Sequence, residues 1–297
     1  MIKKTLYFGS PAYLHLRDQQ LVIKKQLPGF HAETRPIEDI GVIILDHGQI
    51  TISHNAIKEL QSNNVVIISC DDSHMPHSIM LPLEGHSEQS QRYKVQLEAS
   101  LPLKKMLWQQ TIIAKINNQQ KVLQILDKPY KRLEVLSRRV QSGDVDNVEG
   151  QAAAYYWSTY IEGFVRDRYG LPPNNFLNYG YAILRAIVAR ALISSGLILT
   201  IGIHHKNKYN AFCLADDIME PFRPFVDLIV HDMYNNDDLE SFLSPESKKR
   251  LLHLPNVDAL YGKTKRPLMV GMSQTSASLF KCFSGEKRKI VFPKIIL

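Results

Sequence analysis

The chain changes its hydrophobic pattern at Pro82-Leu83-Glu84-Gly85-His86-Ser87, where proline, glycine and polar residues cluster. Such a composition is typical of a domain boundary. Before this stretch, apolar residues form short or alternating runs, and after it they follow a helical period. We therefore predict an α+β protein. Residues 1–85 form a small β-rich domain, and residues 86–297 form a larger, all-helical domain.

The N-terminal part is expected to be a small sheet with one packed helix. Turn signals at Gly9-Ser10-Pro11, Asp18-Gln19 and Asp46-His47-Gly48-Gln49 separate its apolar runs. Residues 55–61 have helical spacing. The predicted strands cover residues 5–8, 13–16, 20–25, 42–45, 50–52 and 64–69.

The C-terminal part is expected to be helical over residues 88–125, 133–140, 149–164 and 176–192. The most apolar stretch, residues 182–203, is interrupted by Arg185 and Arg190, so we predict a buried helix that runs into a loop and not a membrane span. Beyond about residue 254 the helical signal fades. We expect this end of the chain to be only partly ordered.

The composition is that of an ordinary globular protein, with 44% hydrophobic and 22% charged residues among 297. This excludes a disordered, collagenous or coiled-coil chain. The three cysteines, Cys70, Cys213 and Cys282, are far apart and form no CxxC pair, which argues against a disulfide framework and a cysteine-rich zinc site. No secretory signal is visible at the N-terminus. We predict a cytoplasmic location.

Positive charge is concentrated at the C-terminal end. The chain carries a net charge of +7, while the last fifty residues have eleven basic and two acidic residues. This asymmetry favours a polyanionic partner, although a solvated basic tail explains it equally well. The candidate contacts to DNA phosphates are Arg223, Lys248, Lys249, Arg250, Lys263, Lys265 and Arg266.

Polar residues that could bind a metal gather between Gly202 and Asp227. Asp217 and Glu220 are three residues apart on a short predicted helix, so both carboxylates lie on one face. His204 and His205 precede them in a predicted loop, which leaves room for at most one of them as a ligand. Glu149 begins another helix, where small residues allow close helix packing. Spacing alone leaves open whether these groups bind a metal or are ordinary surface and helix-terminal residues.

Four motifs occur in an order and at spacings that resemble one known family. They are Glu149-Gly-Gln-Ala-Ala, Asn178-Tyr-Gly-Tyr-Ala-Ile-Leu-Arg185, the Gly202-Ile-His-His205 turn followed by Asn210, and Asp217-Ile-Met-Glu220-Pro-Phe-Arg-Pro224. In these motifs the chain resembles the CRISPR-associated spacer-acquisition integrase, the universal first-numbered Cas protein. It looks most like the members that accompany type II, Cas9-type, effector systems. The resemblance covers nearly the whole chain and implies the same division into a β-domain and a helical domain.

The resemblance also implies a catalytic site. Carried over by position, the divalent-metal ligands are Glu149, His205 and Glu220, with Asp217 as a further acidic ligand candidate. Two carboxylates and an imidazole suit Mg²⁺ or Mn²⁺ better than a structural zinc. The implied activity is that of a metal-dependent DNA endonuclease and integrase. It inserts short foreign DNA fragments into a CRISPR array by attack of a 3′-hydroxyl on repeat-end phosphodiesters.

The implied partners are double-stranded DNA, a second copy of the chain joined through the β-domain, and the family's small second acquisition protein. For Arg223 we favour an ion pair with Asp217 or Glu220 over a phosphate contact, and for Tyr179 and Tyr181 a place in the core. Two other hypotheses remain open. One is a DNA-binding scaffold without catalysis, and the other is a stand-alone nuclease that acts on branched DNA.

Overall fold

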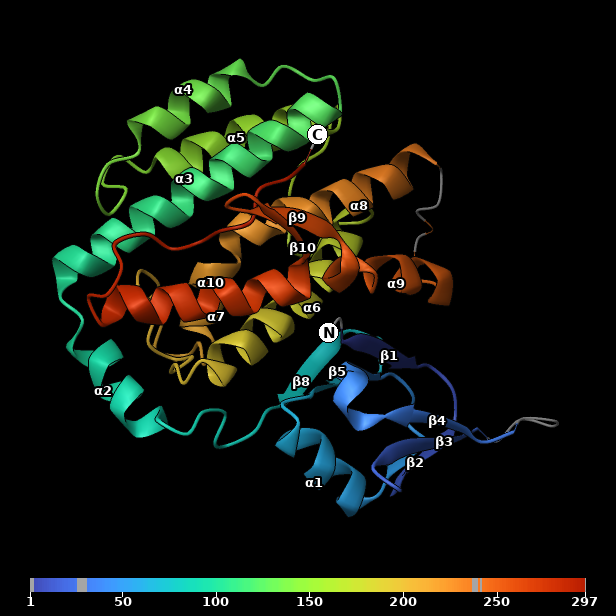
Figure 1. The fold of residues 1–297 in the computed structure, drawn as a ribbon. Coiled ribbons are helices and arrows are strands. Elements are labelled where there is room, and N and C mark those ends of the chain that lie inside the picture. The colour runs from blue at the N-terminus through green and yellow to red at the C-terminus, as the bar shows by residue number, and fades with distance from the viewer. Residues whose placement is uncertain (1–2, 26–30, 237–239, 241, 297) are drawn as a thin grey trace. The chain divides into compact units, whose positions relative to one another are not determined.

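The computed structural model describes residues 3–25, 31–236, 240 and 242–296. The chain divides into two compact units, Met1–Gly85 and His86–Leu297. Strands dominate the first unit and helices the second (Figure 1), which confirms the predicted α+β class.

The first unit consists of two four-stranded sheets. In one sheet β5 pairs in parallel with β1 and β7, and β8 closes the edge antiparallel to β7. In the other, β3 pairs antiparallel with β2 and β4, while β6 lies parallel to β2. The strands are β1 (Lys4–Phe8), β2 (Ala12–Arg17), β3 (Gln20–Lys25), β4 (Glu33–Pro36), β5 (Ile40–Leu45), β6 (Ile50–Ile52), β7 (Val66–Cys70) and β8 (Pro76–Met80).

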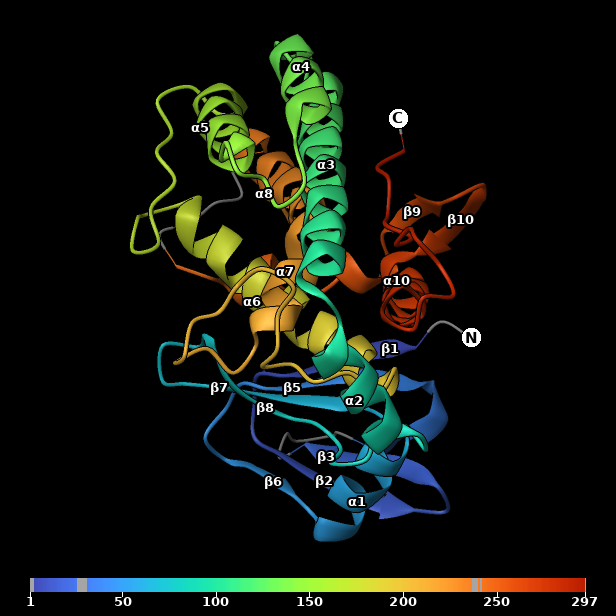
Figure 2. The same cartoon turned by 90° about the vertical axis from the view of Figure 1, so that its left-hand side faces the viewer.

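One apolar core joins the two sheets and helix α1 (His54–Ser62). Figure 2 shows the sheets as two layers. Leu14 and Leu21 come from one sheet, Ile40 and Ile43 from the other, and Leu60 from the helix, all fully buried. The prediction of a single sheet was therefore wrong. The prediction missed β4 and β8 because these strands are polar and largely exposed, without a hydrophobic run or a regular alternation.

In the second unit, the predicted helix over residues 88–125 is divided in two, α2 (Gln89–Glu98) and α3 (Leu101–Ile125). Ser100 caps the second helix, since its hydroxyl accepts a hydrogen bond from the amide of Leu103. Pro102 in the first turn also favours a helix start at this point. The long α3 packs against α4 (Lys131–Arg139), α5 (Val148–Tyr160) and α8 (Arg223–Asn235).

The apolar helix α6 (Asn174–Ser194) is buried among its neighbours, as predicted. It packs against α7 (Cys213–Met219), α8 and α10 (Leu268–Phe283). Among the described helices it alone is long and apolar enough to cross a membrane, and 78% of its most apolar window is buried inside the protein. The remaining elements are η1 (Ile37–Asp39) in the first unit, and η2 (Glu220–Phe222), α9 (Pro245–Leu251), η3 (Leu254–Asn256), β9 (Asp258–Tyr261) and β10 (Thr264–Pro267) in the second.

The end of the chain is ordered over residues 242–296, which corrects the prediction of a partly ordered tail. Strands β9 and β10 form an antiparallel hairpin, so the second unit is not helical throughout. The segment after α10 is fastened by buried side chains far away in the sequence. Asn118 accepts a hydrogen bond from the amide of Ile295 (3.1 Å) and donates to the carbonyl of Pro293 (3.0 Å). Such long-range hydrogen bonds leave no local pattern in the sequence.

Candidate metal centre

Glu149 lies in the first turn of α5, and the preceding loop fixes this turn. The carboxylate of Asp144 accepts hydrogen bonds from the amides of Val148 (2.9 Å) and Glu149 (3.0 Å). Asn147 adopts a left-handed conformation with φ of 48°, and its side chain accepts a hydrogen bond from the amide of Gly150 (3.2 Å). These contacts satisfy the free amides of the helix start. They set the direction in which the Glu149 side chain leaves α5.

Glu220 follows α7 directly and is only 6% exposed. Helix α7 is held in place by Asp216, whose carboxylate receives two hydrogen bonds from Arg185 of α6 (2.6 and 2.5 Å) and one from Asn210 (2.7 Å). Arg185 and Asn210 both belong to the motifs that carried the family resemblance. In the structure they position the helix that presents Asp217 and Glu220.

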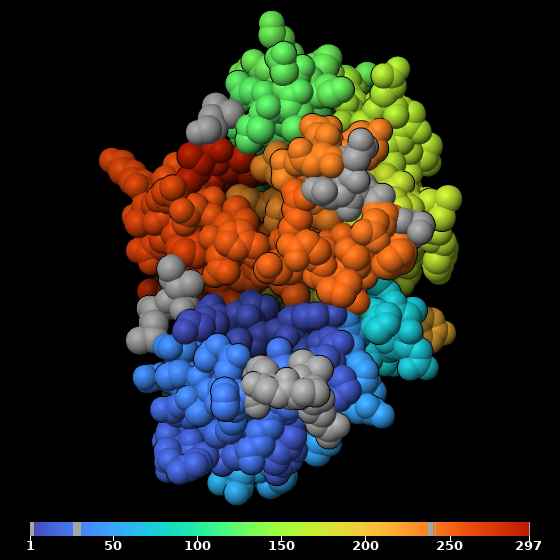
Figure 3. Space-filling model, turned by 90° about the vertical axis from the view of Figure 1, so that its right-hand side faces the viewer, coloured from blue at the N-terminus to red at the C-terminus, as the bar shows by residue number. Residues whose placement is uncertain are grey.

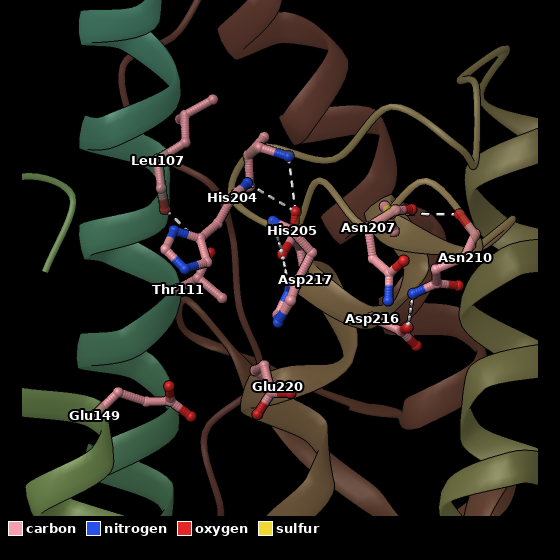
Figure 4. Close-up of polar contacts among 12 residues, drawn as sticks. Leu107, Thr111, Glu149, His204, His205, Asn207, Asn210, Asp216, Asp217 and Glu220 are labelled. Atoms are coloured by element: carbon pink, nitrogen blue, oxygen red, sulfur yellow. Dashed lines mark hydrogen bonds and ion pairs between the residues drawn. The ribbon is translucent and has the colours of Figure 1, made fainter. Parts of the chain in front are cut away.

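Lys115 of α3 lies between the two predicted glutamate ligands. Its Nζ is 2.5 Å from Oε1 of Glu149 and 2.5 Å from Oε2 of Glu220. Both contacts are short ion pairs, and the contact with Glu149 is also a hydrogen bond. Figure 4 shows the two carboxylates, which come from α5 and η2. Both therefore lie within reach of one positive charge.

The sequence analysis missed Lys115, although the sequence carries a signal for it. Lys115 is 8% exposed and lies next to the fully buried Ile112 and Ile116 on the inner face of α3. A lysine at a helical position that otherwise points into the core needs a buried anionic partner. The partners are the glutamates of the site.

The charges of this cluster stabilise one another. Burial lowers the pKa of Lys115, but the Glu220 and Glu149 carboxylates outweigh burial and raise it above its ordinary value. Burial raises the pKa of Glu220, but Arg223 and Lys115 outweigh it and lower the pKa overall. Arg223 Nε is 2.9 Å from Oε1 of Glu220. This is the ion pair that the sequence analysis favoured for Arg223.

Asp217 is completely buried and bonds to the loop that carries His205. Its Oδ2 accepts hydrogen bonds from the amides of Ile203 (2.7 Å) and His204 (2.9 Å). Its Oδ1 accepts from the amide of His205 (3.2 Å) and contacts Nδ1 of the His205 ring (2.5 Å), as Figure 4 shows. Since a carboxylate only accepts, Nδ1 carries the proton and Nε2 keeps its lone pair. This hydrogen bond, partly opposed by burial, raises the pKa of His205.

Gly202 makes this close approach possible. A Cβ at this position would lie 2.6 Å from Oδ2 of Asp217 and 2.7 Å from the carbonyl oxygen of His205, too close for either atom. A glycine is therefore required where the loop wraps around the aspartate.

The two adjacent histidines occupy different environments. The ring of His204 stacks on Trp108, with 4.1 Å between ring centroids and an angle of 4°. Burial lowers the pKa of His204. His204 therefore stacks on an aromatic ring, whereas His205 forms a hydrogen bond with the carboxylate of Asp217.

The donor groups fit a hard divalent cation in part. Glu149 and Glu220 offer carboxylate oxygens to a shared point, which the ammonium of Lys115 contacts. Oxygen donors of this kind suit Mg²⁺ or Mn²⁺. Within the described residues, however, no group of three or more His, Cys, Asp or Glu side chains lies close enough together to hold a metal ion. The four-residue ligand set stays a prediction.

A basic cleft of about 680 Å³ adjoins His205. Three lysines contribute to its lining. Lys104 comes from α3, and Lys206 and Lys208 come from the loop after His205, as does Tyr209. These lysines were not among the predicted DNA contacts, most of which came from the basic C-terminal end of the chain. Their positive charges make the cleft suitable for a polyanion.

The other predicted DNA contacts differ in accessibility. Lys248 is 3% exposed, which removes it from the candidates for a phosphate contact. Arg250 forms an ion pair with Asp232 (2.5 Å). Four candidates remain exposed, and Figure 3 shows the surface formed by this part of the chain in orange to red. They are Lys249, Lys263, Lys265 and Arg266.

Tyr179 and Tyr181 lie in the core, as expected. The hydroxyl of Tyr181 donates to Oδ1 of Asp227 (2.5 Å), and that of Tyr156 donates to Oδ2 (2.8 Å). The sequence contains Asp227 at the end of the polar region, but nothing in its spacing indicates this tyrosine cluster.

The amino-acid sequence matches a known family and its members. The family described as CRISPR associated protein Cas1 matches residues 6–254. A protein of Neisseria meningitidis serogroup C, named CRISPR-associated endonuclease Cas1, is 36% identical over 255 residues. The alignment covers 85% of this chain and 83% of that protein.

Two solved structures share the fold. A casposase bound to integration product superposes with a TM-score of 0.81 at 22% identity, over 98% of this chain and 93% of that one. A chain of a Cas6-RT-Cas1–Cas2 complex superposes with a TM-score of 0.74 at 19% identity, over 99% of this chain and 36% of that one. At these sequence identities the similarity shows a shared fold and nothing further.

Proposed function

Since this chain belongs to the Cas1 family of CRISPR-associated proteins, we propose that it is a metal-dependent DNA endonuclease and integrase that inserts short foreign DNA fragments into a CRISPR array. The family match confirms the resemblance predicted from the four motifs. One observation carries the proposed chemistry. The carboxylates of Glu149 and Glu220 meet at the ammonium of Lys115, and His205, which feels the charge of Glu220, lines a basic cleft.

In this proposal Glu149, Glu220 and Nε2 of His205 hold a Mg²⁺ or Mn²⁺ ion. When bound, the ion supplies Lewis-acid chemistry, which polarises the scissile phosphate and stabilises the leaving oxygen. Asp217 acts through His205 and not as a ligand, because hydrogen bonds from the 203–205 loop already occupy both of its oxygens. It fixes the tautomer and the orientation of the ring.

The reaction is a transesterification. The 3′-hydroxyl of the incoming fragment forms a new bond to the phosphorus at the 5′ end of the repeat strand, and the bond from this phosphorus to the 3′-oxygen of the adjoining nucleotide breaks. The attacking hydroxyl loses its proton and the leaving oxygen gains one. Because the hydroxyl attacks phosphorus directly, no covalent enzyme intermediate is needed. With water as the nucleophile the same site would cut DNA. Lys104, Lys206 and Lys208 neutralise DNA phosphates in the cleft.

The proposed assembly is a cytoplasmic complex. The β-rich unit supplies the contact between two copies, and a small Cas2-type partner joins two such dimers on double-stranded DNA. The shared fold with a chain of the Cas6-RT-Cas1–Cas2 complex supports the choice of a Cas2-type partner. Mass photometry of the full chain, alone and with its partner, tests it. Only a monomer at all micromolar concentrations would refute the dimer.

The function is tested by an integration assay. Purified protein and partner are mixed with a short duplex that has free 3′-hydroxyl ends and with a supercoiled plasmid that carries the repeat. The reaction runs with Mg²⁺, with Mn²⁺ and with EDTA. Joining should need a metal and a free 3′-hydroxyl, and Glu149→Ala, His205→Ala and Glu220→Ala should each abolish it while the fold is retained.

The outcomes separate the hypotheses. DNA binding without joining or cutting under any metal would favour the scaffold. Cutting of branched DNA without partner or donor would favour the stand-alone nuclease. A donor with blocked 3′ ends is the matched control, because it binds the same surface and lacks only the attacking group.

A further inference from the structure

Lys115 has an uncommon environment for a lysine. Its stem lies on the buried face of α3, and its Nζ is 2.5 Å from a carboxylate oxygen of each of two glutamates. Removing such a charge from water is costly unless opposite charges compensate it. Glu149 and Glu220 provide this compensation, and together with Arg223 the two cations balance the two carboxylates.

The two cations that contact Glu220 use different oxygens. Arg223 approaches Oε1, with Nε at 2.9 Å, from the helix that follows Glu220 in the chain. Lys115 approaches Oε2, with Nζ at 2.5 Å. Arginine has a planar group suited to a fixed ion pair, whereas lysine carries a compact charge on a flexible stem. The contact of Lys115 is therefore the easier one to exchange.

We propose that Lys115 is a tethered counter-ion that competes with the divalent cation for Glu149 and Glu220, and that the displaced ammonium then neutralises an oxygen of the DNA phosphate. The inference deepens the proposed function and rests on it, since it takes Glu149 and Glu220 as metal ligands. A divalent ion and an ammonium group cannot share the space between the two carboxylates. Their charges repel each other strongly at contact distance in a buried site.

The proposal predicts that metal and DNA assist each other. Metal binding displaces the ammonium from its carboxylates, and a phosphate offers the displaced charge a new partner close to α3. Each ligand thus removes part of the cost of binding the other, and the coupling is reciprocal. The site would bind the metal weakly until DNA arrives, which limits cutting in the absence of the substrate complex.

Two substitutions at this position should change metal affinity in opposite directions. Lys115→Met keeps most of the length and removes the charge, so the Mn²⁺ dissociation constant without DNA should fall at least about tenfold. Lys115→Arg keeps the charge and adds a forked donor that binds carboxylates more firmly, so the dissociation constant should rise several-fold. A merely structural role would weaken metal binding in both variants. Isothermal titration calorimetry of the full chain with Mn²⁺ measures both values.

The second measurement is strand transfer at saturating Mn²⁺. Lys115→Met should bind the metal more tightly and yet join DNA at least about tenfold more slowly, because the phosphate loses a positive charge. Lys121→Met is the matched control on the same helix, where the half-buried Lys121 donates a hydrogen bond to Gln124, and it should change neither value. Equal or weaker Mn²⁺ binding by a folded Lys115→Met variant would overturn the proposal.

Lys115→Met takes the cation from Glu149 and leaves Glu220 with Arg223 alone, so the variant could fail to fold without metal. In that case Lys115→Arg decides the question, because it retains the charge. Unchanged or tighter Mn²⁺ binding by Lys115→Arg would then refute the competition. Glu220→Gln separates this inference from the proposed function. If Glu220→Gln binds Mn²⁺ like the wild type, the proposed ligand set fails. If it loses Mn²⁺ while the Lys115 variants behave like the wild type, only the competition fails.

Discussion

Two buried acids of the helical unit, Glu220 and Asp227, lie seven residues apart, but their partners differ and their pKa values shift in opposite directions. Glu220 has Lys115 and Arg223 as its partners, and these charges outweigh burial and lower its pKa. Asp227 has mainly hydroxyl partners, and burial raises its pKa to about 6. A charged partner can be replaced by another cation, whereas hydroxyl donors occupy the oxygens of Asp227 and leave no place for one. Burial alone thus does not distinguish a candidate metal ligand from a structural acid, whereas the nature of the partners separates these two residues.

The largest effect is expected for strand transfer when the two acids are neutralised in turn. Glu220→Gln keeps the shape and removes the charge, and it should lower the rate about a thousandfold or more, because the metal loses an anionic ligand. Asp227→Asn should change the rate only a few-fold, since the amide can still bond to the hydroxyls of Tyr156 and Tyr181. The integration assay with Mn²⁺ measures both rates.

Circular dichroism spectra of both variants provide the control for folding. Equal loss of activity in the two variants, with intact spectra, would show that the distinction between the acids is wrong. A Glu220→Gln variant with wild-type activity would remove Glu220 from the site altogether.

The second prediction concerns the pH dependence of stability. The pKa of Asp227 is about 6 in the folded chain, above the value of about 3.9 for an unfolded aspartate. Between these values the folded state binds more protons than the unfolded state. The contribution of Asp227 to the free energy of unfolding therefore decreases as the pH rises from about 4 to about 6. Above that range the contribution stays at its lower value.

Asp227→Asn lacks this titration. Relative to the wild type, the variant should gain stability as the pH rises through this range, by an amount on the order of 3 kcal/mol. Urea unfolding at a series of pH values gives the difference between the two proteins, in which all other titrating groups cancel. A constant difference from pH 4 to pH 7 would mean that Asp227 keeps an ordinary pKa.

The sequence predicted those elements whose own residues show a hydrophobic period. The strands β2 and β3 and the helices α5 and α6 lie close to their predicted ranges because each has a clear apolar pattern. The hairpin of β9 and β10 and the terminal segment depend on partners elsewhere in the chain, such as the side chain of Asn118. No local pattern could indicate those contacts.

The site was predicted mainly from the resemblance and less from physical pattern. Spacing placed Asp217 and Glu220 on one short helix, but it could not show that Asp217 faces the 203–205 loop while Glu220 faces α3. Lys115 was missed because its role depends on two glutamates, 34 and 105 residues further along the chain. A charged residue within an apolar helical face was the available signal.

The third prediction extends the comparison to His204 and His205. His205→Ala should abolish detectable strand transfer, a loss of more than about a hundredfold, because it removes a proposed ligand together with the partner of Asp217. His204→Ala loses the stacking on Trp108, which costs on the order of 1 kcal/mol of stability, and it should change transfer only a few-fold. The integration assay and thermal unfolding measure the two effects. A larger catalytic loss for His204→Ala than for His205→Ala would show that His204, and not His205, is the histidine of the site.

The smallest effect is expected for an exposed lysine, which contrasts with the buried Lys115. Lys265 on β10 is 63% exposed at its side chain and lies 3.2 Å from Asp258. If it contacts a DNA phosphate, Lys265→Ala should weaken DNA binding a few-fold and reduce the slope of log affinity against log salt concentration by about 1. Fluorescence anisotropy with a short duplex at several NaCl concentrations measures the slope. Lys58→Ala, which removes an exposed lysine from α1, is the control and should leave the slope unchanged. Equal slopes for Lys265→Ala and the wild type would show that the hairpin charge is only solvated, and the basic cleft beside His205 would then be the better candidate for the DNA contact.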